Sequence, residues 1–375
     1  MTLPQKTTIH RHLREFLRES FLPPRNTGTP ADGTAPRRII SVDLAKGLCI
    51  LLVVLYHLNS QVFGLPNFDA LRMPLYFVLS GLFFKPYGDI AAFTVRKINN
   101  ILIPFLFWML VSYLCMLAYR YTLRHQIAPL NNLWVGFSTH NIYLNRPLWF
   151  MLCLFLTHHL FYLLHRTLPA AARLAGVLLL ALVGNAVSAA GYYLPLWLDS
   201  ACTAMPLFYM GYLLKQSSLL ERRSRWTHTL SAGLLSIAAA YLLYYHFDAP
   251  TCSFRTNEIK GSIPILYLDS CLFVLGVLLL CKTIRWLPLL SYWGRYSLII
   301  LCVHPLYIRY LPTLCKHNGI TLSATSLRLL ILLLCWLSLP LFKTLLPRFT
   351  AQKPLLRIPR RTTPASAPAA DPRTP

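Results

Sequence analysis

Long apolar segments recur from one end of this chain to the other, and they constrain its fold more than any other feature. A helix needs about 20 apolar residues to cross a bilayer, and inside lipid only helices or closed barrels satisfy every backbone hydrogen bond. Segments near that length lie at residues 40–60, 70–85, 101–120, 147–165, 173–190, 192–214, 229–246, 264–281, 294–311 and 325–346. With 55% hydrophobic and 13% charged residues, the chain is predicted to be an all-α, polytopic membrane protein with about ten transmembrane helices.

Polar tails flank the apolar region, which we assign to a membrane domain over residues 39–347. Within the first tail, residues 1–38, apolar side chains repeat at helical spacing among arginines over residues 1–22. That pattern fits either a helix lying on an anionic membrane surface or a solvated tail. Residues 23–38 form a Pro/Gly/Thr-rich linker, and residues 348–375 are predicted to be a disordered basic tail.

The basic residues are unevenly distributed between the two sides of the predicted bundle. Eleven Lys and Arg lie in four alternate connections, against eight in the other five, although those five are longer in total. Seven more lie in each tail, with the second counted from Lys343. By the positive-inside rule, both termini are expected in the cytoplasm. The formal net charge of +24 therefore indicates orientation and contact with membrane lipids, and no nucleic-acid partner is expected.

The first predicted span, SVDLAKGLCILLVVLYHL, carries Asp43, Lys46 and His57 among its apolar residues. Lys46 is the only basic residue placed well inside a span, and because a buried ammonium costs about 2.5–3.5 kcal/mol, such residues are usually paired and functional. Eleven residues make three helical turns, so Lys46 and His57 share one face about 16 Å apart. Asp43 lies one turn before Lys46 on that face. The span therefore predicts a polar path that ends at an imidazole suited to proton abstraction.

A second interpretation of this span stays open. Asp43 and Lys46 could simply pair with each other, while His57 makes an ordinary hydrogen bond between helices. Gly47, beside Lys46, leaves room for a neighbouring helix or for a ligand.

Other predicted spans bring polar groups to similar depth. In GRYSLIILCVHPLY, Ser297 lies near one end and His304 about 10 Å further along the helix, a depth comparable to that of His57. A histidine before proline is also a common packing or kink feature. The short span MPLYFVLSGLFF offers Tyr76 and Ser80, and short spans often line cavities. Further candidates are Arg146, Trp149 and Phe150 in NRPLWF, and the buried acid Asp269, whose partner the sequence does not identify.

The ten cysteines lie mostly within apolar runs and never form a C-x-x-C pair. They are therefore predicted to pack in the bundle, and we expect no bound metal or cofactor. Cys202 and Cys252 could both face the outside, so a disulfide between them stays open.

Taken in order, these segments resemble the membrane-bound acyltransferase family 3, whose members O-acetylate bacterial polysaccharides. The matching pieces, over about residues 38–312, are Asp43-x-x-Lys46-Gly47 followed by His57, then MPLYFVLSGLFF, VRKINNILIPFLFW, PLWFML and WGRYSLIILCVHPLY. Each piece is short, but five in the right order are specific. Lys46 is a departure, because the family more commonly has arginine there and lysine is familiar in the subgroup that resembles fucose 4-O-acetylases. Lysine and arginine differ at bidentate sites, so the departure bears on the role of Lys46 and not on its location.

The resemblance implies an integral membrane O-acyltransferase. Such an enzyme moves an acyl group, usually acetyl from cytoplasmic acetyl-coenzyme A, to a hydroxyl of a cell-surface glycan or lipid-linked sugar. It also implies a bacterial inner (plasma) membrane, because the family is mainly bacterial.

The same resemblance implies roles for individual residues. His57 would be the general base toward the hydroxyl or a transient acyl carrier, and Lys46 and Asp43 would line the donor path. Residues assigned to the phosphates of coenzyme A are Arg96, Lys97 and Lys215, which are equally well explained as orientation signals. Residues assigned to substrate binding are Ser80, Trp149, Ser297 and His304.

Two other classes of membrane protein would also contain buried polar residues. A transporter or exporter could use Asp43, Lys46 and His57 as a proton or solute path. Transporters often contain internal repeats, however, and the DLAKG element has no counterpart elsewhere in the chain. A structural or partner-binding subunit would not need a polar stripe three turns long.

Overall fold

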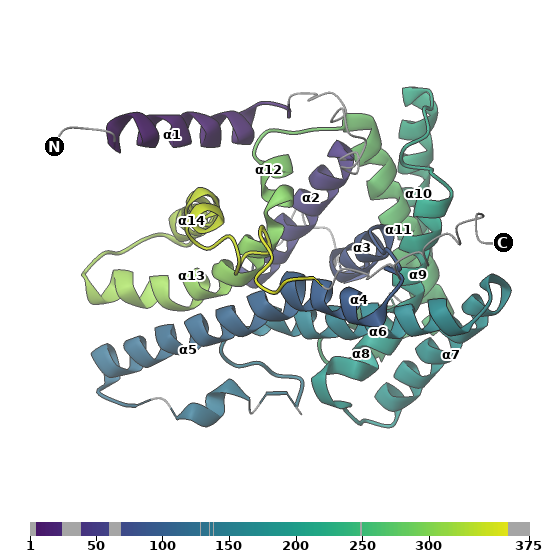
Figure 1. The fold of residues 1–375 in the computed structure, drawn as a ribbon, viewed down its shortest axis with the longest axis horizontal. Helices are drawn as coiled ribbons and strands as arrows, with labels where there is room; N and C mark the ends of the chain where they lie inside the picture. The colour runs from purple at the N-terminus through teal and green to yellow at the C-terminus, as the bar shows by residue number, and fades with distance from the viewer. Residues whose placement is uncertain are drawn as a thin grey trace, which may run out of the picture.

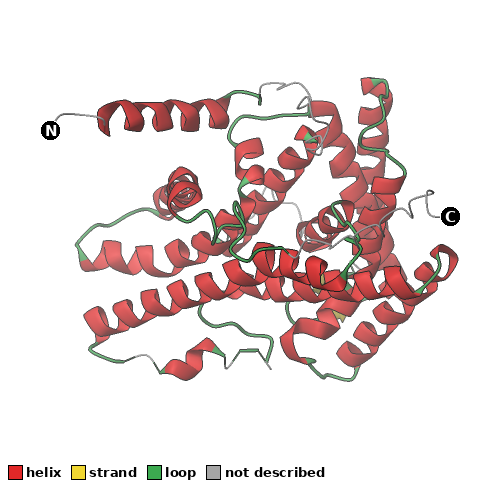
Figure 2. Cartoon of the chain, in the orientation of Figure 1, coloured by secondary structure: helices red, strands yellow, loops and turns green. Residues whose placement is uncertain are grey.

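The computed structural model describes residues 5–24, 39–59 and 69–358, apart from residues 128, 135, 138, 248 and 249. This part of the chain is mostly helical, which confirms the all-α prediction (Figures 1 and 2). The α-helices are α1 (Gln5–Phe21), α2 (Ile40–His57), α3 (Asp69–Leu82), α4 (Ile90–Lys97), α5 (Ile103–Arg124), α6 (Trp149–Thr167), α7 (Ala170–Ala189), α8 (Leu198–Thr203), α9 (Met205–Gln216), α10 (Trp226–His246), α11 (Ile263–Ile284), α12 (Leu290–Arg295), α13 (Ser297–His317) and α14 (Ala324–Leu345).

The remaining elements are short and connect the helices. A π-helical turn, η1 (Ile98–Leu102), joins α4 to α5. The 3₁₀ turns are η2 (Leu130–Leu133), η3 (Arg146–Leu148) and η4 (Pro195–Trp197), and two antiparallel strands, β1 (Thr251–Ser253) and β2 (Glu258–Lys260), form a small hairpin. In the register of this hairpin, Cys252 on β1 lies opposite Ile259 on β2.

Among the described residues, eight helical stretches are long and apolar enough to cross a membrane: Ile40–His57, Ile90–Leu123, Arg146–Thr167, Ala170–Ala189, Trp226–His246, Ile263–Ile284, Ser297–His317 and Ala324–Leu345. Their number and length support a multi-pass membrane protein. The expected span at 70–85 is α3, a helix of 14 residues with Pro74 inside it. The expected span at 192–214 is divided into η4, α8 and α9, because Leu196 and Trp197 have φ values of 59° and 64°, which a continuous helix does not allow.

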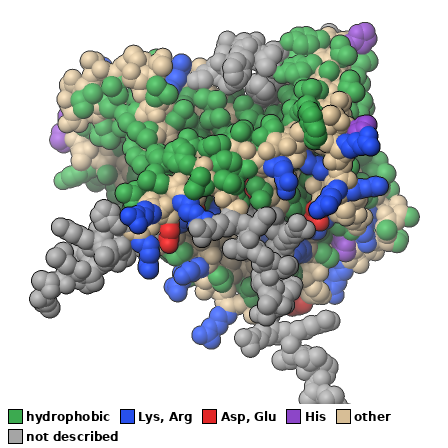
Figure 3. All heavy atoms as spheres, turned by 90° about the horizontal axis from the view of Figure 1, so that it is seen from above, with side chains coloured by type: hydrophobic (Ala, Val, Ile, Leu, Met, Phe, Trp, Pro, Cys, Tyr) green, Lys and Arg blue, Asp and Glu red, His purple; other side chains and the backbone are tan. Residues whose placement is uncertain are grey.

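Three of the long helices present mostly exposed apolar side chains. Only 22% of α7, 17% of α10 and 22% of α14 is buried, against 56% of α2. Leu235 on α10 is 70% exposed and Leu182 on α7 is 64% exposed. Figure 3 shows hydrophobic side chains over much of one face of the molecule, with Lys and Arg gathered toward one side of that view. Such surfaces suit contact with lipid, because lipid does not penalise exposed leucine.

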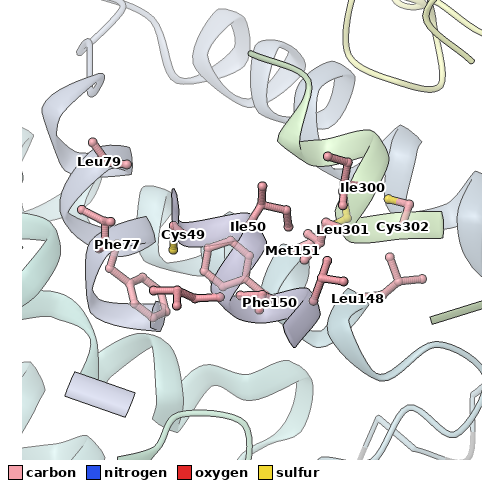
Figure 4. Close-up of a cluster of buried hydrophobic side chains, with 14 of the residues drawn as sticks. Cys49, Ile50, Phe77, Leu79, Leu148, Phe150, Met151, Ile300, Leu301 and Cys302 are labelled. Carbon is pink, nitrogen blue, oxygen red and sulfur yellow. The ribbon is translucent and has the colours of Figure 1, made fainter. Parts of the chain in front are cut away.

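Helix α2 lies in the middle of the bundle, where it contacts α3, α11, α12 and α13 (Figure 1). Side chains from distant parts of the chain meet around it in one hydrophobic cluster (Figure 4). Cys49 and Ile50 come from α2, Phe77 from α3, Phe150 from α6 and Ile300 from α13, and all are buried. This packing holds the helix that carries Asp43, Lys46 and His57 against the others.

The two tails are more structured than the sequence predicted. The first contains α1, so the proposed amphipathic segment is helical, while residues 25–38 of the linker lie outside the described residues. Residues 348–358 of the expected disordered C-terminal tail pack against the bundle, because Asn99 and Trp108 bond to their backbone. Residues 359–375 lie outside the described residues.

All ten cysteines are free thiols. Cys202 and Cys252 are both buried, and no disulfide joins them. Burial raises the pKa of the Cys252 thiol, which keeps it protonated at neutral pH.

Candidate active site

Asp43, Lys46 and His57 lie on one unbroken helix, as their spacing predicted. The Lys46 ammonium lies 4.6 Å from the ring centroid of Phe83, just beyond the end of α3. His57 is the last residue of α2. We refer to these two regions of the bundle as the Lys46 end and the His57 end.

The His57 end contains a pair of histidines. The ring centroids of His57 and His304 are 5.2 Å apart, with an angle of 48° between the rings. His304 is fully buried, and its Nδ1 donates a hydrogen bond of 2.7 Å to the carbonyl oxygen of Ile300. Since a carbonyl oxygen only accepts, the proton lies on Nδ1 and the lone pair on Nε2. Among the described residues, Nε2 has no hydrogen-bond partner, so it remains able to accept one from a substrate.

Two arginines bring positive charge to this histidine pair. Arg72 on α3 and Arg146 in η3 both lie close enough for their charges to act on the His57 imidazole. Arg72 is only 8% exposed, and its guanidinium lies 3.7 Å from the ring centroid of Tyr56. Arg72 lies in the first turn of α3 and was not among the predicted site residues, so this site contains a buried basic side chain besides the predicted Lys46. Guanidinium groups beside an imidazole can stabilise an oxyanion that forms there.

Tyr76 and Ser297 face each other between α3 and the start of α13. The Tyr76 ring also packs on Phe150, with centroids 5.5 Å apart. Ser80 donates its hydroxyl hydrogen to the carbonyl oxygen of Tyr76 at 2.7 Å, which is a bond within its own helix. Of the two serines predicted to bind substrate, Ser297 is therefore the better placed.

Trp149 lies in an aromatic group beside this site. It is 6% exposed, and its ring centroid lies 6.1 Å from that of Phe150 and 6.4 Å from that of Trp197. Arg146, whose charge acts on His57, lies one turn before Trp149.

Two glycines allow α2 and α12 to touch through their backbones. A Cβ atom at Gly47 would lie 1.8 Å from the carbonyl oxygen of Leu290, and one at Gly294 would lie 1.7 Å from that of Asp43. No other residue fits at such distances. The space predicted beside Gly47 is filled by a helix, and the contact joins the DLAKG segment to the WGRYS segment.

A buried His–Asp pair on the same side of the bundle as Trp149 was not predicted. His140 Nε2 lies 3.3 Å from Asp199 Oδ1, and both side chains are fully buried. The His140 ring stacks on Trp197 with centroids 5.0 Å apart, and Arg255 donates to the carbonyl oxygen of His140 at 3.0 Å. These contacts join three connections that are far apart in sequence, and no spacing pattern in the sequence signals them.

Arg96 and Lys97, both predicted to bind the donor, point in different directions. Lys97 Nζ lies 3.2 Å from His158 Nε2, beside an aromatic cluster that includes Phe84 and Phe161. The Arg96 guanidinium lies 4.2 Å from the ring centroid of Tyr87. Lys215, in the last turn of α9, is exposed.

The buried acid Asp269 on α11 stays without an assigned role. It is 1% exposed, and neither carboxyl oxygen has a hydrogen-bond partner among the described residues. In the same part of the chain, no group of three or more His, Cys, Asp or Glu side chains is placed to hold a metal ion.

The model of one protein family matches this chain. The family is described as an acyltransferase domain, of the acyltransferase family 3, and the match covers residues 39–342. It runs from the start of α2 into the last turns of α14 and so includes every element of the site. No curated protein and no solved structure matches the chain.

Proposed function

The chain belongs to the acyltransferase family 3, and from that premise we propose that it transfers an acetyl group from cytoplasmic acetyl-coenzyme A to a hydroxyl of a cell-surface glycan or lipid-linked sugar. The observation that carries the proposal is the pairing of His57 with His304, 5.2 Å apart, beside the charges of Arg72 and Arg146. A base, a hydrogen-bond acceptor and two cations together are what transfer to a hydroxyl requires.

In the proposed reaction, His57 accepts the proton of the acceptor hydroxyl as its oxygen attacks the thioester carbonyl. The new C–O bond forms, and the carbonyl oxygen becomes an oxyanion that Arg72 and Arg146 stabilise. The C–S bond then breaks, and the thiolate of coenzyme A leaves and takes up the proton held by His57. His304 accepts a hydrogen bond at Nε2 and orients either the hydroxyl or His57.

A second route uses the same residues. His57 itself attacks the thioester carbonyl, the C–S bond breaks, and coenzyme A leaves as the thiol with the proton from the other ring nitrogen. The acceptor hydroxyl then attacks the acyl-imidazole, the C–N bond breaks, and the hydroxyl proton returns to the ring. This route suits a donor and an acceptor that approach from opposite ends of α2, because Lys46 and His57 lie about 16 Å apart by helical rise. Donor access at the Lys46 end, past Asp43, and acceptor access at the His57 end are both part of the proposal.

Three finer assignments belong to the proposal as well. We place the protein in a bacterial inner membrane with both termini in the cytoplasm, on the distribution of its Lys and Arg residues. We assign it to the subgroup that resembles fucose 4-O-acetylases, on the lysine at position 46. His304 and Trp149 are assigned to the acceptor side, a placement that the pairing of His304 with His57 supports for the first of them.

The test is the mass of surface glycans from cells that produce the native protein, His57→Ala, Lys46→Ala or the control His317→Ala. His317 is an exposed histidine at the end of α13. We expect an increment of one acetyl group with the native protein and the control, and its loss with His57→Ala. An increment that persists in His57→Ala contradicts the mechanism, and an increment of another mass identifies a different acyl group.

A further inference from the structure

A segment of the C-terminal tail, Pro347–Ile358, crosses the first turns of α5 and ends beside η1. We call it the strap. The Phe349 ring stacks on that of Phe107 with centroids 4.2 Å apart and an angle of 16°. Trp108 donates from Nε1 to the carbonyl oxygen of Phe349 at 3.3 Å. The strap therefore begins with an aromatic anchor on α5.

Its other end is held by a single asparagine. Asn99, 2% exposed, accepts hydrogen bonds at Oδ1 from the backbone N–H groups of Leu355 and Leu356, at 2.8 and 2.7 Å. Its Nδ2 donates to the carbonyl oxygens of Leu356 and Val95, both at 3.0 Å. Asn99 thus uses both of its acceptor positions and both of its donor hydrogens. It lies in the π-helical turn η1, and π-helical turns are frequent at functional sites.

The strap is bound through its backbone, so most of its side chains point away from the bundle. Leu355 and Leu356 are each 43% exposed. Two cationic side chains near the asparagine, Lys353 and Arg357, are exposed as well. Because the strap is held by its backbone, its two cationic side chains stay exposed while the chain that carries them is fixed to the bundle.

The strap is bound to the helical turn that follows Arg96, a residue predicted to bind the donor. Arg96 lies three residues before Asn99, which places the two on neighbouring positions of one helical surface. Lys97 is directed inward to His158, so it is poorly placed to meet a ligand that arrives from outside. Besides Arg96, the strap therefore contributes exposed cationic groups beside this helical turn.

We propose that the strap is part of the donor site, where Lys353 and Arg357 join Arg96 in binding the phosphate groups of coenzyme A. This rests on the proposed function, because it takes acyl-coenzyme A as the donor. Phosphate oxygens form charge-assisted hydrogen bonds with lysine and arginine, and flexible exposed cations also attract an anionic ligand before it binds. Phosphate is also the headgroup chemistry of anionic lipids, so the test separates these two sources.

The experiment uses the full-length protein in nanodiscs and measures the binding of coenzyme A. Lys353→Ala/Arg357→Ala is expected to weaken binding about fivefold and to raise the KM for acetyl-coenzyme A by the same factor, with kcat unchanged. The matched control, Arg222→Ala/Arg223→Ala, removes two exposed charges from the connection between α9 and α10 and is expected to change neither.

A variant that releases the strap from the bundle gives a second, independent test of the proposal. Asn99→Ala should weaken coenzyme A binding as much as the double variant and should raise hydrogen exchange over residues 347–358, while Asn100→Ala, its exposed neighbour, should do neither. If Asn99→Ala does not fold, the double variant still decides the matter, because both of its side chains are exposed.

The possible outcomes distinguish failure of the proposed role of the strap from failure of the proposed acyltransferase function. Native binding and KM in the double variant overturn the role of the strap and leave the acyltransferase mechanism standing. A native protein that neither binds coenzyme A nor transfers an acyl group overturns the proposed function itself. Unchanged coenzyme A binding together with lost stabilisation by phosphatidylglycerol in the nanodisc assigns the two cations to lipid and also overturns the proposal.

Discussion

The His57 end and the Lys46 end of α2 are built from different kinds of contact. At the His57 end, His304 and Arg72 are buried side chains on long or well-packed helices. At the Lys46 end, the two chain tails, α1 and the strap, lie against the bundle. The proposed site of chemistry is thus built from side chains packed between helices, whereas the proposed donor side is covered by tail segments held through a few contacts.

Helix α1 illustrates how the tails attach. Glu19 binds Lys343 at 2.6 Å and Arg295 at 3.3 Å, and Phe16 packs on Trp336 with centroids 4.8 Å apart. Arg295 directly follows Gly294 in α12, so α1 contacts the short helix that touches α2. Leu13 on another part of α1 is 50% exposed, and contact of that surface with lipid stays a prediction.

The largest effect should come from removing the imidazole at the His57 end. His57→Ala is expected to lower the rate of acyl transfer about 10²- to 10⁴-fold, because the transition state loses its base or acyl carrier. The unfolding temperature should stay close to that of the native protein, since His57 is only half-buried. Initial rates in nanodiscs measure the first quantity, and His317→Ala serves as the control. Equal rates in the two variants would show that the chemistry lies elsewhere.

Gly294→Ala tests whether the contact between α2 and α12 fixes the position of α2, and with it both the Lys46 end and the His57 end. A Cβ atom there would lie 1.7 Å from the carbonyl oxygen of Asp43, so the helices must separate, at a cost of about 1–3 kcal/mol or more. We expect lower thermal stability together with reduced activity. Gly88→Ala is the matched control, because its Cβ would meet nothing within 4 Å. A native melting curve for Gly294→Ala would contradict the backbone contact.

His304→Ala asks whether the second histidine positions the reacting groups. Its ring lies 5.2 Å from that of His57, and loss of a positioning group lowers rates by about tenfold to a hundredfold. The kcat should fall while the KM for the donor stays the same, because the donor is proposed to enter at the opposite end. A raised donor KM with native kcat would place the donor beside His304 and reverse the proposed orientation.

The smallest effect is expected at the attachment of α1. Glu19→Gln keeps the shape of the side chain and removes its charge, and partly exposed ion pairs contribute about 0.2–1 kcal/mol each. Proteolysis of residues 5–24 should become faster, while kcat stays native. Glu221→Gln, at an exposed acid between α9 and α10, controls for charge alone. A strong loss of kcat would mean that α1 acts on the chemistry through α12.

Local features of the sequence predicted much of this architecture. The apolar lengths indicated the long spans, and the spacing of Lys46 and His57 placed them on one continuous helix. His304 was identified by a depth comparable to that of His57, and the pairing of the two rings supports that reasoning. The prediction that Ser80 binds substrate has weaker support, because its hydroxyl donates a hydrogen bond to a carbonyl oxygen of its own helix. The spacing of residues in the sequence does not reveal which partner a serine hydroxyl bonds to.

Other features were not predictable from spacing. Arg72 resembled a residue of a connection, and its place beside His57 depends on how the short helix α3 packs on α2. His140 and Asp199 are 59 positions apart, the first in a connection and the second inside the expected span at 192–214, and no spacing pattern relates them. The strap has the composition of a disordered tail, and it is ordered by Asn99, more than 250 residues earlier in the chain.

What the sequence by itself determined are the spans, the polar stripe on α2 and the family, because hydrophobicity, helical spacing and motif order are properties of neighbouring residues. Only the tertiary structure decided which groups face His57, how Gly47 and Gly294 allow two helices to touch, and where the strap ends. These are contacts between segments far apart in the chain, and their geometry follows from close packing of the whole bundle.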